Sequence, residues 1–354
     1  MSVGADPRPG LRDIEVYDAP QLDVPVRLNT NECPHPLPEA FMEELAATIR
    51  DLPLHRYPDG QMRRLLAELA AASMHPVDGV WAANGSNEVL TQLLQAYGGP
   101  GRRAAVLEPT YLLHARLCRL TNTEVEHLAL GDDFVLGPEQ VADVVTSAPD
   151  VVLVCSPNNP TGNAQPLSSI VEIARALPGA LVIVDEAYRE FAPAASAQAL
   201  IATNPNIAIT RTFSKAFALA GARLGYLLAS PQVVDDLQRV RLPYHLSALT
   251  QAAGIVALRH RDDASALLGA IRVQRDRIMR ELRTLPRVTV YPSDANFVLF
   301  VPPIEVGAVW QGLLDRGVLV RDLSAVVPNA LRVTAGTERE TDQFLDAIKE
   351  VLAG

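Results

Sequence analysis

The stretch TFSKAFALAGARLG, from Thr212 to Gly225, decides the fold of this chain. In this stretch Lys215 follows Ser214, and Arg223 comes eight residues later among small side chains. A lone lysine is ordinarily a solvated surface charge. Here the neighbouring hydroxyl and second cation indicate an amine that is held beside a bound anion.

Two apolar runs upstream also end in polar side chains. Residues 181–184 (LVIV) lead into Asp185, and residues 151–155 (VVLVC) lead into a turn-like segment that contains Asn159. Such runs are typical of buried parallel strands, whose carboxyl ends carry ligand chemistry. We therefore expect the amide, the carboxylate and the Lys215 amine to meet at one edge of a sheet. Taken singly, Asp185 also suits a helix N-cap, and the Asn159 segment suits a turn.

This constellation resembles the fold type I, or aspartate-aminotransferase, group of pyridoxal-phosphate enzymes. The resemblance extends from about Leu28 to about Gly336, and within the group the chain is similar to the histidinol-phosphate aminotransferase family. It implies an α/β fold, in which helices cover a mostly parallel central sheet and a smaller α+β domain follows. Strand-like and helical segments alternate from about residue 80 to 230, as this fold class requires.

Three parts are expected along the chain. They are an N-terminal arm (1–35), a large cofactor-binding domain (36–250) and a small domain (251–354) that the N-terminal segment completes. A long helical stretch is expected from about Ser247 to Arg283.

The resemblance implies a role for each polar group near the cofactor ring. Lys215 is expected to bond to the aldehyde of pyridoxal 5'-phosphate and, once freed, to carry a proton. Asp185 is expected to keep the pyridine nitrogen protonated, so that the ring withdraws electrons. Asn159 and Tyr188 are expected to donate to the phenolic oxygen, and Tyr111 to stack on the ring.

The cofactor phosphate is expected at the start of a helix, where free amides attract anions. The phosphate ligands that the resemblance implies are Gly85, Ser86, Asn87, Thr212, Ser214 and Arg223. Arginine makes a two-pronged contact there that lysine cannot reproduce. Tyr57 matches a tyrosine that reaches the phosphate of the neighbouring subunit, so the resemblance implies a homodimer with shared active sites.

Two arginines lie in apolar runs toward the C-terminal end, Arg321 in VLVRD and Arg332 in LRVTAGT. A buried arginine is costly without an anionic partner. That partner could be an internal carboxylate, for which Asp294, Asp322 and Glu338 are candidates. The resemblance instead assigns both arginines to the anionic groups of the substrate.

The implied reaction moves an amino group from L-histidinol phosphate to 2-oxoglutarate in histidine biosynthesis. Asn31 lies in a signature segment, Leu28–Glu32, that is expected near the substrate. The chain departs from the family at Cys33, where asparagine is usual, and at Leu112-Leu113 after the stacking tyrosine. Both departures make the pocket more apolar, so an aromatic or otherwise specialised amine donor stays open.

The sequence leaves one other function open and argues against another. A decarboxylase of the threonine-phosphate type would use the same cofactor residues, and the sequence does not fix which bond breaks. A regulator built on an aminotransferase domain would need a DNA-binding extension, which the N-terminal arm does not offer.

Composition limits the partners. The chain has 31 basic and 41 acidic residues, and its net charge of −10 argues against nonspecific affinity for nucleic acid or anionic membrane. The three cysteines, Cys33, Cys118 and Cys155, show no spacing typical of metal ligands, so no metal is expected. The N-terminal segment lacks the apolar core of a secretory signal, and no apolar run reaches the roughly 18–20 residues of a membrane span. We expect a cytoplasmic enzyme with small anionic substrates.

Overall fold

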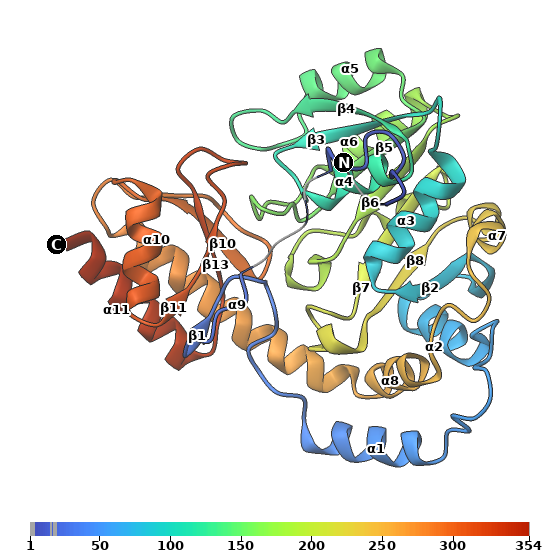
Figure 1. Ribbon diagram of the computed structural model, residues 1–354, viewed down its shortest axis with the longest axis horizontal. Helices are drawn as coiled ribbons and strands as arrows, with labels where there is room; N and C mark the ends of the chain where they lie inside the picture. Colours follow the sequence, from blue (N-terminus) through green and yellow to red (C-terminus); the bar gives the residue numbers. More distant parts are fainter. Residues whose placement is uncertain (1–3, 15, 17–19, 354) are drawn as a thin grey trace.

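The computed structural model describes residues 4–14, 16 and 20–353. Its largest sheet has seven strands in the order β2-β8-β7-β6-β5-β3-β4 (Figure 1). The strands are β2 (Val80–Asn84), β3 (Arg103–Glu108), β4 (Glu124–Ala129), β5 (Val151–Cys155), β6 (Leu181–Asp185), β7 (Ile207–Thr212) and β8 (Leu224–Leu228). Within this sheet, β8 runs against the other strands. The predicted α/β class with a mostly parallel sheet is confirmed.

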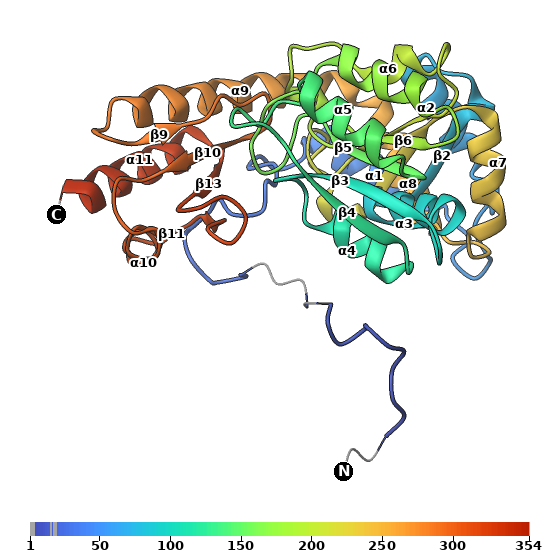
Figure 2. The ribbon, with the colours of Figure 1, turned by 90° about the horizontal axis from the view of Figure 1, so that it is seen from above.

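Helices cover both faces of this sheet because its central strands are apolar on both sides. Every residue of β5 and β6 is buried. Figure 2 shows α5 (Pro138–Ser147) and α6 (Leu167–Ala176) on one side, with α3 (Ser86–Tyr97) and α4 (Leu113–Leu120) on the other. The remaining helices of this part are α1 (Glu39–Arg50), α2 (Arg63–Ser73), α7 (Pro231–Val240) and α8 (Ala248–Arg259).

A second, antiparallel sheet lies toward the C-terminal end, with four strands in the order β12-β13-β10-β9. Its strands are β9 (Thr289–Val290), β10 (Phe297–Val301), β12 (Arg321–Asp322) and β13 (Leu331–Thr334), and its helices are α9 (Arg261–Arg283), α10 (Val306–Asp315) and α11 (Glu338–Ala353). They enclose an apolar cluster separate from that of the large sheet. The proposed boundaries at residues 36–250 and 251–354 stay a prediction.

The N-terminal segment joins this second part. Strand β1 (Val26–Arg27) pairs in parallel with β11 (Val318–Leu319), and Leu28 is buried in the same apolar cluster. The arm expected at residues 1–35 lies partly outside the described residues, which omit 1–3, 15 and 17–19. Within its described part, Arg8 Nη1 donates to Asn122 Oδ1 (2.5 Å) just after α4.

The helical stretch expected from Ser247 to Arg283 is two helices. Helix α8 ends at Arg259 and α9 begins at Arg261, with His260 between them. Its ring bonds Glu44 of α1 (2.9 Å) and Asp263 of α9 (3.1 Å). The break lets α8 pack on the large sheet and α9 on the small one.

No helix within the described residues combines the length and the apolar character that a membrane crossing needs. In the same part of the chain, no group of three or more His, Cys, Asp or Glu side chains could hold a metal ion.

Candidate active site

A cavity of about 370 Å³ opens where β5, β6 and β7 end, between the large sheet and the small one. This volume suits a small-molecule ligand. The predicted site residues that line it are Asn31, Ser86, Asn87, Tyr111, Asn159, Asp185, Tyr188, Thr212, Ser214, Lys215, Arg223, Arg321 and Arg332. Two predicted residues, Gly85 and Tyr57, are not part of the lining.

Asp185 is the last residue of β6 and is almost completely buried. Its Oδ1 accepts from Thr210 Oγ1 and from the Ala187 amide, both at 3.2 Å. Its Oδ2 lies 3.3 Å from His114 Nε2. Three neighbours therefore fix the carboxylate in the wall of the cavity, where it can pair with a cationic group of a ligand.

Lys215 lies just beyond β7, and its Nζ donates to the Thr30 carbonyl (2.9 Å). Burial, together with the cations Arg332 and Arg223, lowers the pKa of Lys215 to about 8, while Glu32 opposes the shift. Near neutral pH a useful fraction of the amine is therefore uncharged, which is the form that attacks an aldehyde.

An anion cradle lies at the other end of the cavity, where Ser86 opens α3. Gly85 has φ of 79°, and a Cβ there would collide with the Arg223 guanidinium. Arg223, itself at φ of 53°, donates from Nη1 to Ser214 Oγ (3.3 Å). A Cβ at Gly225 would overlap the Gly85–Ser86 backbone. Because both glycines lack a Cβ, the start of α3, the Arg223 side chain and the first residues of β8 can approach one another closely. The cradle has the donors and the positive charge that a phosphate needs.

A chain of hydrogen bonds crosses the cavity from the small sheet to Tyr188. Arg332 Nη1 donates to Asn159 Oδ1 (2.5 Å), and Asn159 Nδ2 lies 3.4 Å from the Tyr188 hydroxyl. Burial raises the pKa of Tyr188, and Arg332 and Asn31 partly offset that rise. The phenol therefore stays protonated and can donate to an oxygen of the ligand.

The Asn31 side chain is engaged within the protein. Its Nδ2 donates to the Tyr188 hydroxyl (3.0 Å), and its Oδ1 accepts from Thr334 Oγ1 (3.1 Å). It is 1% exposed. This geometry favours a role in holding Tyr188, alongside the substrate contact that the sequence suggested.

The two arginines of the small sheet are cross-strand partners, because Arg321 of β12 is in register with Arg332 of β13. Such partners lie on one face of a sheet. Arg332 also donates from Nη2 to the Asn29 carbonyl (2.9 Å), and its guanidinium lies 5.1 Å from the Phe297 ring centre. Two cations thus face the cavity from one side.

These groups together fit pyridoxal phosphate. A fixed carboxylate, an amine of lowered pKa, a phenol and a phosphate cradle all face one cavity with Tyr111, whose hydroxyl lies 3.3 Å from Asn87 Oδ1. The class I and II aminotransferase profile matches residues 24–348 of the chain. The chain belongs to the class I and II aminotransferase family.

Relatives of this aminotransferase match it over nearly their whole length. A histidinol-phosphate aminotransferase of Mycolicibacterium smegmatis is 48% identical over 98% of this chain and 93% of its own. One of Streptomyces avermitilis is 48% identical over 99% of this chain and 98% of its own. The crystal structure of histidinol-phosphate aminotransferase from Sinorhizobium meliloti, in complex with pyridoxal-5'-phosphate, superimposes with a TM-score of 0.87 at 23% identity, covering 99% of each chain. This last likeness shows the fold.

Tyr57 lies on the surface of the aminotransferase, away from its own cavity. It is 80% exposed and stacks on Tyr244, with ring centres 4.6 Å apart. Leu54 and Leu242, near them in the sequence, are also exposed. Tyr57, which the family resemblance places at the active site of a neighbouring subunit, therefore does not contribute to the cavity of its own chain.

Sequence reasoning missed two residues that hold Asp185. His114 is fully buried against the carboxylate, and Thr210 donates to it. Both had a signal in the sequence. His114 comes three residues after Tyr111, which places it on the same side of a helical turn. Thr210 alternates with Thr212 along β7, so both side chains point to the same face.

Proposed function

We propose that this aminotransferase binds pyridoxal 5'-phosphate and transfers the amino group of L-histidinol phosphate to 2-oxoglutarate, giving imidazole-acetol phosphate and L-glutamate in histidine biosynthesis. The observation that carries the proposal is the meeting of Lys215, Asp185 and three arginines in one cavity. Relatives that bear the name of this activity, at 48% identity over nearly the full chain, support the choice of substrate.

The bound cofactor supplies the electron sink on which transamination depends. Asp185 holds a proton on the pyridine nitrogen, and His114 and Thr210 keep that carboxylate in place. Lys215 would hold the aldehyde of the cofactor, and its freed Nζ would be the group that accepts and returns the substrate proton. Tyr188 and Asn159 orient the phenolic oxygen.

The remaining cofactor contacts fix the ring and its phosphate. Tyr111, which lines the cavity, would stack on the ring. The proposed phosphate ligands are Gly85, Ser86, Asn87, Thr212, Ser214 and Arg223. Their convergence around the start of α3 supports this assignment.

Arg332 and Arg321 are proposed to bind the anionic group of each substrate in turn. Histidinol phosphate and glutamate are both anionic, and a ping-pong transaminase must accept them at the same place. Guanidinium groups suit this task because they pair with either carboxylate or phosphate through two parallel hydrogen bonds.

An aromatic amino acid is the second candidate donor. The cavity wall includes the apolar side chains of Leu112, Leu323 and Val326, and Leu112 is half exposed. Apolar surface of this kind would also receive a phenyl ring.

We further propose that the enzyme is a cytoplasmic homodimer. The stacked Tyr57 and Tyr244, and Leu54 and Leu242 near them in the sequence, are exposed side chains that a second copy would cover. In such a dimer, Tyr57 would reach the cofactor phosphate of the other subunit. Sedimentation should then give twice the chain mass, and Tyr57→Ala should weaken cofactor binding.

The substrate is tested by half-reactions of the purified holoenzyme. Histidinol phosphate, phenylalanine, tyrosine and threonine phosphate are mixed singly with the enzyme, and loss of its visible absorbance is followed. We expect histidinol phosphate to give the highest kcat/KM. Preference for phenylalanine would favour the second donor, and release of carbon dioxide from threonine phosphate would identify a decarboxylase.

A further inference from the structure

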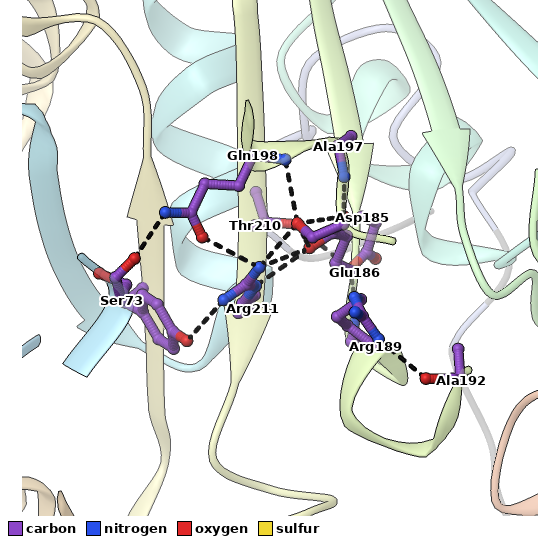
Figure 3. Close-up of polar contacts among 12 residues, drawn as sticks. Ser73, Asp185, Glu186, Arg189, Ala192, Ala197, Gln198, Thr210 and Arg211 are labelled. Carbon is purple, nitrogen blue, oxygen red and sulfur yellow. Dashed lines mark hydrogen bonds and ion pairs between the residues drawn. The ribbon is translucent and has the colours of Figure 1, made fainter. Parts of the chain in front are cut away.

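A second polar row lies behind the cavity, on the opposite face of the large sheet. Successive side chains of a strand point to opposite faces. Asp185 is in register with Thr210, and both side chains meet on the cavity side. The next residues, Glu186 and Arg211, therefore turn to the far face, where Arg211 is in register with Tyr226 of β8. Figure 3 shows Glu186 and Arg211 bonded to each other beside Asp185.

Glu186 is held from three directions. Arg211 approaches Glu186 Oε2 with both Nε (3.0 Å) and Nη2 (2.9 Å). Ser196 Oγ lies within 2.9 Å of both carboxylate oxygens, and the Ala197 amide donates to Oε1 (2.7 Å). The side chains of Glu186 and Arg211 are only 3% and 12% exposed. This carboxylate has little freedom to move.

The network extends from Arg211 to neighbouring elements. Arg211 Nη2 donates to Ser196 Oγ (2.8 Å) and to Gln198 Oε1 (3.3 Å). Gln198, in the short helix η3 (Ala197–Leu200), donates to the Ser73 carbonyl at the end of α2 (2.6 Å). Arg211 Nη1 lies 3.5 Å from the Tyr226 hydroxyl. One guanidinium thus ties β6, β7, β8 and η3 together.

Charged and titratable groups around Arg211 keep it cationic. Burial alone would lower the pKa of Arg211, but Tyr226, Glu186 and Glu190 outweigh burial and raise it. Burial raises the pKa of Glu190, and Arg211 opposes that rise. Arg211 therefore stays cationic beside Glu186.

A buried ion pair is a poor source of stability, because desolvation offsets most of the attraction and an apolar pair is often as stable. What the pair supplies is a fixed geometry. Glu186 and Asp185 share a peptide bond, and the Glu186 amide donates to the Thr210 carbonyl (2.9 Å). A shift of the Glu186 carboxylate would rotate this end of β6 and move Asp185 on the other face.

We propose that Arg211 and Glu186 are positioning residues, which from the far face of the sheet fix the Asp185 carboxylate where the cofactor ring nitrogen binds. The inference rests on the proposed function, since it requires the cofactor. It adds a support to Asp185 that is separate from the His114 and Thr210 contacts in the cavity.

The decisive variant is the double substitution Arg211→Met/Glu186→Leu, because it leaves no buried charge without a partner. Three measurements are made: thermal unfolding of the cofactor-free protein, cofactor affinity by titration, and the pH dependence of the visible absorbance of the bound cofactor. We expect unfolding close to wild type and a cofactor dissociation constant raised on the order of tenfold to a hundredfold. The pH midpoint of the absorbance change should rise, because a ring that holds its proton less firmly withdraws electrons more weakly.

Arg103→Met is the matched control. It breaks a more exposed ion pair between two other strands of the same sheet, Arg103 with Glu126 (3.6 Å). Arg103 opens β3, whereas Asp185 closes β6. This variant should keep the wild-type cofactor affinity and titration. Arg211→Lys keeps the charge but loses the two-pronged contact, so it should lie between wild type and the double variant.

The results separate this inference from the proposed function. A wild-type protein that binds no cofactor would refute the proposed function itself. A wild-type protein with the expected absorbance, and a double variant that matches it in affinity and titration, would overturn only the positioning role. A double variant that does not fold would also overturn it, since the pair would then serve the fold.

Discussion

The two sheets contribute to the same cavity in different ways. The seven-stranded sheet offers groups at or beyond its strand ends, with Asp185 closing β6 and Lys215 following β7. The four-stranded sheet offers Arg321 and Arg332 from within β12 and β13. Polar groups at strand ends can face the cavity directly, whereas a cation within a buried strand needs hydrogen-bond partners from neighbouring residues. Arg332 meets this need through Asn159 and the Asn29 carbonyl.

This difference suggests a division of labour. The large sheet would hold the cofactor, and the small sheet, with the N-terminal segment paired to it, would hold the anionic end of the substrate. Substitutions in the first should then change cofactor spectra and kcat, and substitutions in the second should mainly change KM. Four experiments test this division, in order of decreasing effect.

Lys215→Ala should have the largest effect. Loss of the amine removes both the attachment to the aldehyde and the proton carrier, so turnover should fall by about 10⁴-fold or more. Visible absorbance of the protein with added cofactor and steady-state assays would measure this. Circular dichroism should show an intact fold. Turnover within tenfold of wild type would mean that the amine of another residue does the chemistry.

Asp185→Asn should have the next largest effect. The amide keeps the size of the side chain but cannot stabilise a protonated ring nitrogen, so kcat should fall by roughly 10²- to 10³-fold. KM should change little, because the substrate anion site is on the other sheet. Asp185→Glu is the control that retains the charge and should recover part of the rate. An unchanged kcat in Asp185→Asn would remove this residue from the mechanism.

Arg332→Met should mainly weaken substrate binding. The loss of a two-pronged ion pair should raise the KM for both substrates by about tenfold to a hundredfold, and Arg321→Met should have a smaller effect in the same direction. Cofactor affinity, measured by titration, should stay near wild type. A fall in kcat with unchanged KM would contradict the division between the sheets.

The smallest effect concerns the pKa of Lys215. Because this pKa is lowered to about 8, the uncharged amine should increase as pH rises through that value. The rate at which cofactor-free protein reacts with added pyridoxal phosphate should therefore rise with pH, with a midpoint near 8. Arg332→Met removes a cation that lowers this pKa, so the midpoint should move upward, toward the ordinary value of 10.5. Arg332→Lys retains the charge and should leave the midpoint in place, and equal midpoints in the two variants would show that the charge of Arg332 does not contribute.

Much of the site was predictable from the sequence because its polar groups lie at the ends of strands and at the start of a helix, which have recognisable local patterns. An apolar run that ends in Asp185, or the Gly85–Asn87 start of α3, is a local pattern. The spacing of His114 and Thr210 was also visible in the sequence. It predicts a role for them only once it is known that both side chains contact the Asp185 carboxylate. Tyr57 was expected at the active site of a second subunit, and its exposure in a single chain leaves that expectation open to experiment.

The sequence by itself determined the α/β class, the strand ends and the residue types that suit pyridoxal phosphate, because periodicity and turn chemistry act over a few residues. Only the tertiary structure decided which distant groups meet. Asn31 bonds Tyr188, 157 residues away, and Thr334, 303 residues away. Arg211 and Glu186 form their pair behind the sheet because the register of β6 and β7 brings them together. Such contacts depend on how whole elements pack, and no local spacing encodes them.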